Sequence, residues 1–225
     1  MKNKQLKIFN LISAFCLLSF VFLILIKAQE PTPSAPKSAT VPGVKEKKLA
    51  NGLIVAVVER KNVPLVTVQL LIRGGADTEG FEKAGLANMT ASLLTKGTKT
   101  RSATQIAEQM EFLGGSINSG AGWNSSSVVI NVMSDKLDQA VPIMADVVLN
   151  PAFSQKEIDL LKSQIQDGLA YNLKQPGFLA NYVASVYSFD EHPAGGTPES
   201  INAIKRADIL KFKTQNYQPK CRIET

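Results

Sequence analysis

The sequence has few of the side chains that bind metals or form disulfides: two cysteines and one histidine among 225 residues. Cys16 lies in an apolar N-terminal run, so an exported domain keeps only Cys221. One cysteine cannot form an internal disulfide or a multi-thiolate zinc site. His192 is the only histidine, and this excludes a two-histidine metal site built from this chain alone.

The folded part also lacks a block of basic charge. The formal net charge is +6, but four of the 25 basic residues lie within residues 1–28, which contain no acidic residue. The remainder therefore carries 21 basic and 19 acidic residues. A nucleic-acid-binding protein concentrates basic charge in its folded part, so the composition predicts no nucleic-acid partner.

The one long hydrophobic run is at the N-terminus, where residues 9–26 are nearly all apolar and follow Lys2, Lys4 and Lys7. This layout is typical of a secretory signal, and we assign residues 1–28 to it, with cleavage after Ala28. The run is also close to the length that spans a bilayer, so an uncleaved anchor at residues 9–26 is the alternative. Both predict a periplasmic or extracellular domain that contacts the membrane only through this segment.

Residues 29–44 form a linker rich in Pro, Ser and Ala, and residues 45–225 form one domain. Asn51-Gly52 separates two extended runs and predicts a hairpin with a type I′ turn. With the strand at 64–73, this hairpin predicts an antiparallel meander. A further strand region is expected at 115–134, and helices at 83–95, 102–113, 135–149, 154–175, 177–188 and 206–216, with a short turn at 198–204. Strand runs followed by helix runs indicate an α+β domain, an antiparallel sheet with helices on one face.

The helix expected at 83–95 carries the most specific motif. Its sequence, from Lys83 to Thr98, is Lys-Ala-Gly-Leu-Ala-Asn-Met-Thr-Ala-Ser-Leu-Leu-Thr-Lys-Gly-Thr. This run resembles the zinc-motif helix of the pitrilysin/insulinase-type metallopeptidases, Gly-Leu-Ala-His-x-x-Glu-His-x-x-x-Lys-Gly-Thr. Similar segments follow in order across about 45–219, among them Arg73-Gly74-Gly75, Asn150-Pro151-Ala152-Phe153, His192-Pro193 and Asn216-Tyr217-x-Pro219.

The departures from this motif bear on function. In active members two histidines one helical turn apart bind zinc, and the glutamate between them is the general base. The resemblance places Asn88 and Ser92 at the histidine positions and Ala91 at the glutamate position. The third ligand, a glutamate in a downstream helix, aligns with Gly168, one residue after Asp167. The resemblance therefore implies a non-catalytic member without a metal or another cofactor.

Family members pair two such domains around an unfolded peptide. The resemblance thus implies a non-catalytic subunit that pairs, as a heterodimer, with a zinc-bearing homologue to form a peptide-degrading chamber. A stand-alone scaffold or peptide-binding module is the alternative, and a residual hydrolase using Asp167 and His192 is a third. Family chains continue beyond the Asn-x-Tyr-x-Pro segment, so a truncated fragment of a longer protein is also left open.

Two single residues have both functional and structural interpretations. His192 could be a ligand or an acid/base group, but a lone histidine in a turn is expected to be a capping or surface residue. Trp123, the only tryptophan, could stack on a peptide or a partner subunit, or could pack at a strand end against the helices.

Overall fold

The structure is a computed structural model that describes residues 43–60, 62–188 and 192–218. The predicted signal or anchor and most of the linker therefore lie outside the described residues. Pro42–Thr225 forms one compact unit, and all that follows concerns its described part. Within that part, no helix is both long and apolar enough to cross a membrane.

The first element is the predicted hairpin. Strands β1 (Val44–Lys48) and β2 (Ile54–Val58) pair antiparallel as a separate two-stranded sheet. The predicted type I′ turn is wrong, because Gly52 alone has a positive φ, of 88°. The Gly52 amide instead donates to the Leu49 carbonyl at 2.9 Å, and the Asn51 side chain accepts from the Leu53 amide at 3.1 Å. The asparagine thus stabilises the turn through its side chain without a left-handed backbone.

The main sheet has three antiparallel strands, β3 (Leu65–Arg73), β4 (Ser116–Ala121) and β5 (Ser125–Met133), in the order β3-β5-β4. The predicted meander is therefore wrong, since β3 pairs with β5 from Leu65↔Met133 to Arg73↔Ser125 and not with β2. Every residue of β2 is exposed, whereas alternate residues of β5 are buried. Pairing with β5 directs alternate side chains of β3 toward the core. The exposed strand β2 covers no core, so pairing with it would not bury these side chains.

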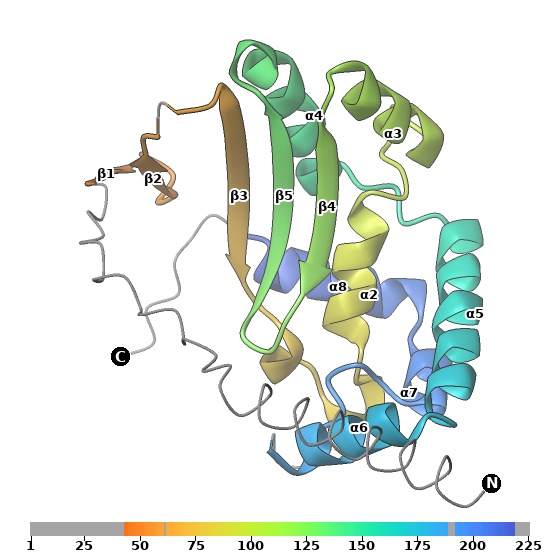
Figure 1. Cartoon of the computed structure of the whole chain (residues 1–225). Coiled ribbons are helices and arrows are strands. Elements are labelled where there is room, and N and C mark those ends of the chain that lie inside the picture. The colour runs from red at the N-terminus through yellow and green to blue at the C-terminus, as the bar shows by residue number, and fades with distance from the viewer. Residues whose placement is uncertain (1–42, 61, 189–191, 219–225) are drawn as a thin grey trace, which may run out of the picture. The chain divides into compact units, whose positions relative to one another are not determined.

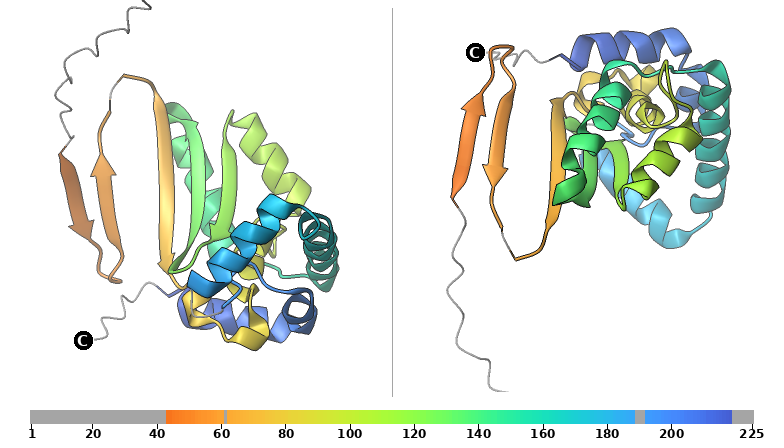
Figure 2. Two further views of the ribbon diagram at one scale, coloured as in Figure 1. Left: turned by 60° about the horizontal axis from the view of Figure 1, so that its bottom comes forward. Right: turned by 90° about the horizontal axis from the view of Figure 1, so that it is seen from above.

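Helices cover one face of this sheet, as Figures 1 and 2 show, and this confirms the α+β class. Three 3₁₀ turns, η1 (Ala76–Thr78), η2 (Phe81–Lys83) and η3 (Ser134–Lys136), precede helices. The helices of the described part are α2 (Leu86–Leu94), α3 (Ala103–Phe112), α4 (Leu137–Leu149), α5 (Gln155–Asn172), α6 (Pro176–Ser188), α7 (Pro198–Ala203) and α8 (Arg206–Asn216).

Helix α2 is the centre of the core. Seven of its nine residues are buried, and Met89 and Leu94 have no exposed surface. They belong to one apolar cluster with Val128 and Ile130 of β5 and with residues of α3, α4, α5, α7 and α8. Burial on several sides fixes the rotation of α2 about its axis, so the directions of its two half-buried polar side chains, Asn88 and Ser92, are fixed too.

The link from α2 to α3 is held by an ion pair. Arg101 contacts Asp146 of α4 at 2.5 Å, and the Thr100 hydroxyl donates to the same carboxylate at 3.1 Å. Burial alone would raise the pKa of Asp146, but hydrogen bonds from Thr98, Asn150, Arg101 and Thr100 outweigh it and lower this pKa to about 2. The segment between α2 and α3 is thus fixed to α4.

Gly85 sets the start of α2. It precedes the helix with a φ of 93°, a left-handed conformation that glycine adopts without strain. A Cβ added there would lie 2.6 Å from Cδ1 of Ile201 and 3.3 Å from the backbone of Gly196. Both the backbone conformation and the close packing against α7 therefore require glycine.

We expect Gly85→Ala to lower the free energy of unfolding by at least about 1–3 kcal/mol, because it combines left-handed strain with a steric clash. Gly80→Ala is the matched control, since Gly80 has a φ of −80° and no atom within 4 Å of an added Cβ. Chemical denaturation of both variants measures the difference. Equal stability of the two variants would contradict this account of how α2 begins.

Candidate functional site

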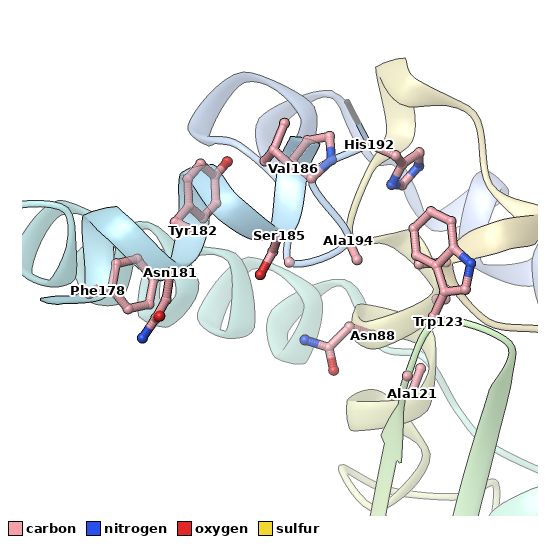
Figure 3. Close-up of a pocket in the computed structure, with 15 residues that line it drawn as sticks. Asn88, Ala121, Trp123, Phe178, Asn181, Tyr182, Ser185, Val186, His192 and Ala194 are labelled. Atoms are coloured by element: carbon pink, nitrogen blue, oxygen red, sulfur yellow. The ribbon is translucent and has the colours of Figure 1, made fainter. Parts of the chain in front are cut away.

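A cavity of about 460 Å³ lies over the N-terminal half of α2. Its walls come from α2, from the β4–β5 turn, from one side of α6 and from residues 192–195. Figure 3 shows Asn88 directed from α2 into the space that α6 borders on the other side, with Trp123 and His192 beside it. Segments far apart in the sequence thus meet over the motif helix.

The cavity lining is apolar with a few neutral polar groups. No lysine, arginine, aspartate or glutamate is among the described residues that line it. The apolar lining includes the methyl groups of Ala76, Ala87 and Ala121 and the rings of Trp123, Phe178 and Tyr182. The polar lining groups are the carboxamides of Asn88 and Asn181, the hydroxyls of Tyr182 and Ser185, and the ring of His192. This chemistry suits an uncharged ligand with apolar parts.

Glu79 holds the start of α2 beneath this cavity. Its carboxylate accepts hydrogen bonds from the backbone amides of Gly85 at 2.7 Å and Ala87 at 2.6 Å. These amides have no partner within the helix, and a negative charge is favourable at a helix N-terminus. Burial nevertheless raises the pKa of Glu79 to about 7, outweighing the hydrogen bonds from Ala87, Gly85 and Leu86, which lower it.

His192 is part of the same buried cluster. Its side chain is 6% exposed, and its ring lies 5.0 Å from that of Phe81 and 5.4 Å, edge-on, from that of Trp123. Nε2 lies 3.9 Å from Oε1 of Glu79, and neither ring nitrogen has a hydrogen-bond partner among the described residues. The expectation of a capping or surface residue is wrong, because aromatic packing and the buried carboxyl group hold this ring inside.

Trp123 has features of both roles that the sequence suggests for it, packing at a strand end and contact with a ligand. It is half-buried at the β4–β5 turn, where its carbonyl accepts from the Asp77 amide at 3.0 Å. Its ring contacts His192 and also lines the cavity. The tryptophan thus packs at a strand end and also lines the cavity.

The motif positions do not converge on the cavity. Asn88 is half-buried and lines it, but Ala91 is fully buried in the core, where its carbonyl accepts from the Ser119 hydroxyl at 2.7 Å. Ser92 is half-buried and is not among the lining residues. Gly168 is half-buried on α5, also away from the lining. Of the four predicted positions, only Asn88 reaches this space.

These residues do not fit a zinc ion. Zinc in proteins requires three or four imidazole, thiolate or carboxylate ligands. The described residues contain no group of three His, Cys, Asp or Glu side chains that could hold a metal. Asp167 is exposed, with Ser163 donating to it at 3.5 Å, and does not line the cavity with His192. No step through a metal is therefore derived for this site.

Two sets of site residues are not predicted from the sequence. Glu79 stands in a glycine-rich loop and has the pattern of a surface residue, since its partners are backbone amides with no sequence signature. The other set lies on α6, whose residues Phe178, Asn181, Tyr182 and Ser185 line the cavity. Their spacing of three and four residues is the one signal that they share a helix face.

Comparisons with known proteins agree with the fold. The family model described as insulinase, peptidase family M16, matches residues 54–185. A Rickettsia bellii protein called an uncharacterized zinc protease is 31% identical over 174 residues, which are 76% of this chain and 42% of that protein. This chain is thus similar to a bacterial protein that is named for zinc-dependent proteolysis.

Two solved structures extend the likeness to three dimensions. A peptidase M16 inactive domain from Pseudomonas fluorescens superposes with a TM-score of 0.69 at 26% identity, over 76% of this chain and 43% of that one. The periplasmic protease PqqL from Escherichia coli has the same fold, with a TM-score of 0.70 at 17% identity, over 81% and 22%. The chain spans less than half the length of each of these three proteins.

The buried Glu79 predicts a pH dependence of stability. Its pKa is about 7 in the folded state against 4.5 as the ordinary value. Between these pH values the folded state binds more protons than the unfolded state, so this group makes the free energy of unfolding fall as pH rises. The fall is on the order of a few kcal/mol and is complete just above pH 7. Glu79→Gln should remove this fall.

Denaturation series from pH 4 to 8 measure this effect in the parent chain, in Glu79→Gln and in the exposed control Glu82→Gln. The parent and the control should lose stability relative to Glu79→Gln as pH rises through the window. A stability difference between parent and Glu79→Gln that is constant with pH would contradict the buried position of this carboxyl group.

The motif positions predict that metal binding can be installed. We expect the parent chain to bind no zinc, and the triple variant Asn88→His/Ser92→His/Gly168→Glu to bind about one ion per chain. Histidines at i and i+4 share one helix face, and no atom lies within 4 Å of a Cβ added at Gly168. Metal analysis after dialysis measures the stoichiometry, with Asn88→His alone as the control. Zinc bound to the parent chain, or no zinc bound to a folded triple variant, would contradict the assignment of these residues to the ligand positions.

Proposed function

The chain belongs to the insulinase family, peptidase family M16, and we propose that it is a non-catalytic member that pairs with a zinc-bearing homologue. In this proposal the two halves enclose a chamber in which the homologue cleaves peptides. This chain supplies the opposite wall and binds the unfolded peptide without cleaving it.

One observation carries the proposal: the family framework is retained around a helix that lacks the zinc-binding groups. Gly85 still begins α2 with a left-handed backbone, and Gly97 and Thr98 still form bridges to Ser102 and Pro151. The positions that matter for chemistry hold an amide, a buried methyl group and a hydroxyl. Loss of a general base alone costs a peptidase about 10²–10⁴ in rate, whereas the scaffold for binding is intact.

An exposed apolar stripe on α6 supports a partner. No residue of α6 is buried, and Leu179, Val183 and Tyr187 are 44%, 44% and 74% exposed. They recur every four residues, so they share a helix face. The adjacent face of α6 lines the cavity. Clustered exposed apolar side chains mark protein interaction sites, and a partner bound to this stripe would close over the cavity.

We place this subunit in the cell envelope. The charged and apolar N-terminal segment supports export, and the periplasmic protease PqqL has the same fold.

A stand-alone peptide-binding module is the second candidate, and the uncharged cavity with its carboxamides favours it equally well. The two candidates differ in the need for a partner. The module binds peptides alone and leaves the activity of every zinc-bearing homologue unchanged.

The test is to mix the full chain with a purified homologue that carries H-x-x-E-H from the same organism, and to follow cleavage of a fluorogenic peptide. We expect the chain to be inactive alone and to raise the homologue's turnover at least severalfold. Val183→Glu on the α6 stripe should abolish this stimulation, because a buried unpaired charge at an interface is strongly unfavourable.

Phe112→Glu is the matched control. Phe112 is 88% exposed on α3, and Figure 1 shows α3 at the opposite end of the domain from α6. This variant should stimulate turnover as the parent does. Equal stimulation by Val183→Glu would overturn the role of α6, and no stimulation by the parent would overturn the pairing.

A further inference from the structure

We propose that the cavity over α2 is a peptide subsite in which the Asn88 carboxamide binds one peptide unit of the ligand backbone, while an adjacent uncharged apolar side chain enters the cavity. This inference rests on the proposed function and specifies its ligand contacts. It gives Asn88, at a former ligand position, a binding role of its own.

The first step concerns the chemistry of Asn88. A carboxamide has both a carbonyl acceptor and an NH₂ donor, so it can pair with the N–H and the C=O of one extended peptide residue. The structure shows no hydrogen bond from the Asn88 side chain to another described residue. The side chain is half-buried and points into the cavity (Figure 3). Its donor and acceptor are therefore available to a ligand.

The second step concerns the side chain beside that peptide unit. Ala87 and Ala121 present methyl groups, and Trp123 and Phe178 present rings, around a space of about 460 Å³. Ligand pockets span about 300–1,000 Å³, so this one suits one or two residues of an extended chain. Apolar surface enters such a space favourably, while a carboxylate or ammonium group would lose its hydration without a counter-charge.

The third step excludes other ligand classes. Phosphate-bearing ligands require Arg, Lys or a free helix N-terminus. The lining offers neither basic side chain, and the start of α2 is already occupied by Glu79. An uncharged peptide segment satisfies both the carboxamide and the apolar walls.

The fourth step is a consequence for measurement. Trp123 is the only tryptophan in the chain, and it lines the cavity. Its fluorescence therefore reports on this wall of the cavity. A ligand that enters the cavity changes the emission of Trp123, whereas a ligand bound to the far surface of the domain does not.

The experiment uses the full chain and fluorescein-labelled octapeptides of Gly, Ser and Gln with one central residue. Anisotropy measures binding, and an unlabelled set measures the change in Trp123 emission. We expect central Phe and Leu to bind about tenfold more tightly than central Gly or Asp, and only binders should change the emission. Equal affinity for Phe and Asp would overturn the apolar subsite.

A thermodynamic cycle then tests the backbone contact. Asn88→Leu removes donor and acceptor at similar size, and N-methylation of successive peptide bonds in the Phe peptide removes one ligand N–H at a time. N-methylation at the bonded position should weaken binding about fivefold to tenfold, as expected for one lost hydrogen bond, and Asn88→Leu should weaken it at least as much because it removes both the donor and the acceptor. Together they should weaken it no further than the larger single change, because both remove the same bond.

Two further variants keep the result interpretable. Asn88→Ser retains an uncharged group that can donate or accept a hydrogen bond and should lose only part of the affinity, which guards against misfolding of the leucine variant. Asn202→Leu, at an exposed position on α7, should bind as the parent does. Fully additive effects at every methylated bond would overturn the role of Asn88.

The outcomes separate the two proposals. Peptide binding without a change in Trp123 emission overturns this subsite and leaves the proposed function standing. Stimulation of the zinc-bearing homologue without peptide binding by this chain also overturns the subsite alone. Neither stimulation nor binding overturns both.

Discussion

The Glu79 carboxylate at the start of α2 is the interaction on which the rest of the site depends. It joins the loop after β3 to the amides of Gly85 and Ala87, six and eight residues further along the chain. Two short hydrogen bonds to otherwise unpaired amides compensate for removing a carboxyl group from water. Burial still raises the pKa of Glu79 to about 7, so the hydrogen bonds offset only part of the cost of burying the charged group.

The neighbours of this carboxyl group set the geometry of the cavity. His192 packs against Glu79 and lies beside Phe81 and Trp123. The β4–β5 turn is tied to the same loop by backbone bonds, including Ala76 to Gly122 at 3.1 Å. Three segments are therefore joined around one buried carboxyl group, and the wall of the cavity is built on them. The position of Asn88 follows from the same anchor, since it lies one residue beyond Ala87.

Local sequence signals predicted the elements well and their pairing poorly. The spacing of apolar residues located α2, α3 and α5, because each of these helices buries apolar residues in the common core. The predicted meander is wrong because it takes β2, the preceding strand in the chain, as the partner of β3, whereas β3 pairs with β5, the strand whose alternate residues are buried. His192 was expected at the surface for the same reason: its neighbours Glu79, Phe81 and Trp123 are distant in sequence. The spacing of apolar residues in α6 did not indicate a buried face, because the apolar stripe of this helix is exposed.

The three motif positions have different environments. Ala91 is packed in the core, where a carboxylate would be buried in apolar surroundings, and Ser92 is half-buried away from the cavity. Asn88 still faces a cavity and still offers hydrogen bonds. The measurement that tests the central claim most directly is to purify the full chain from the envelope of its own cell and identify bound chains by mass spectrometry. We predict a chain with an intact H-x-x-E-H motif at fixed stoichiometry. A stable assembly without such a chain would contradict the claim.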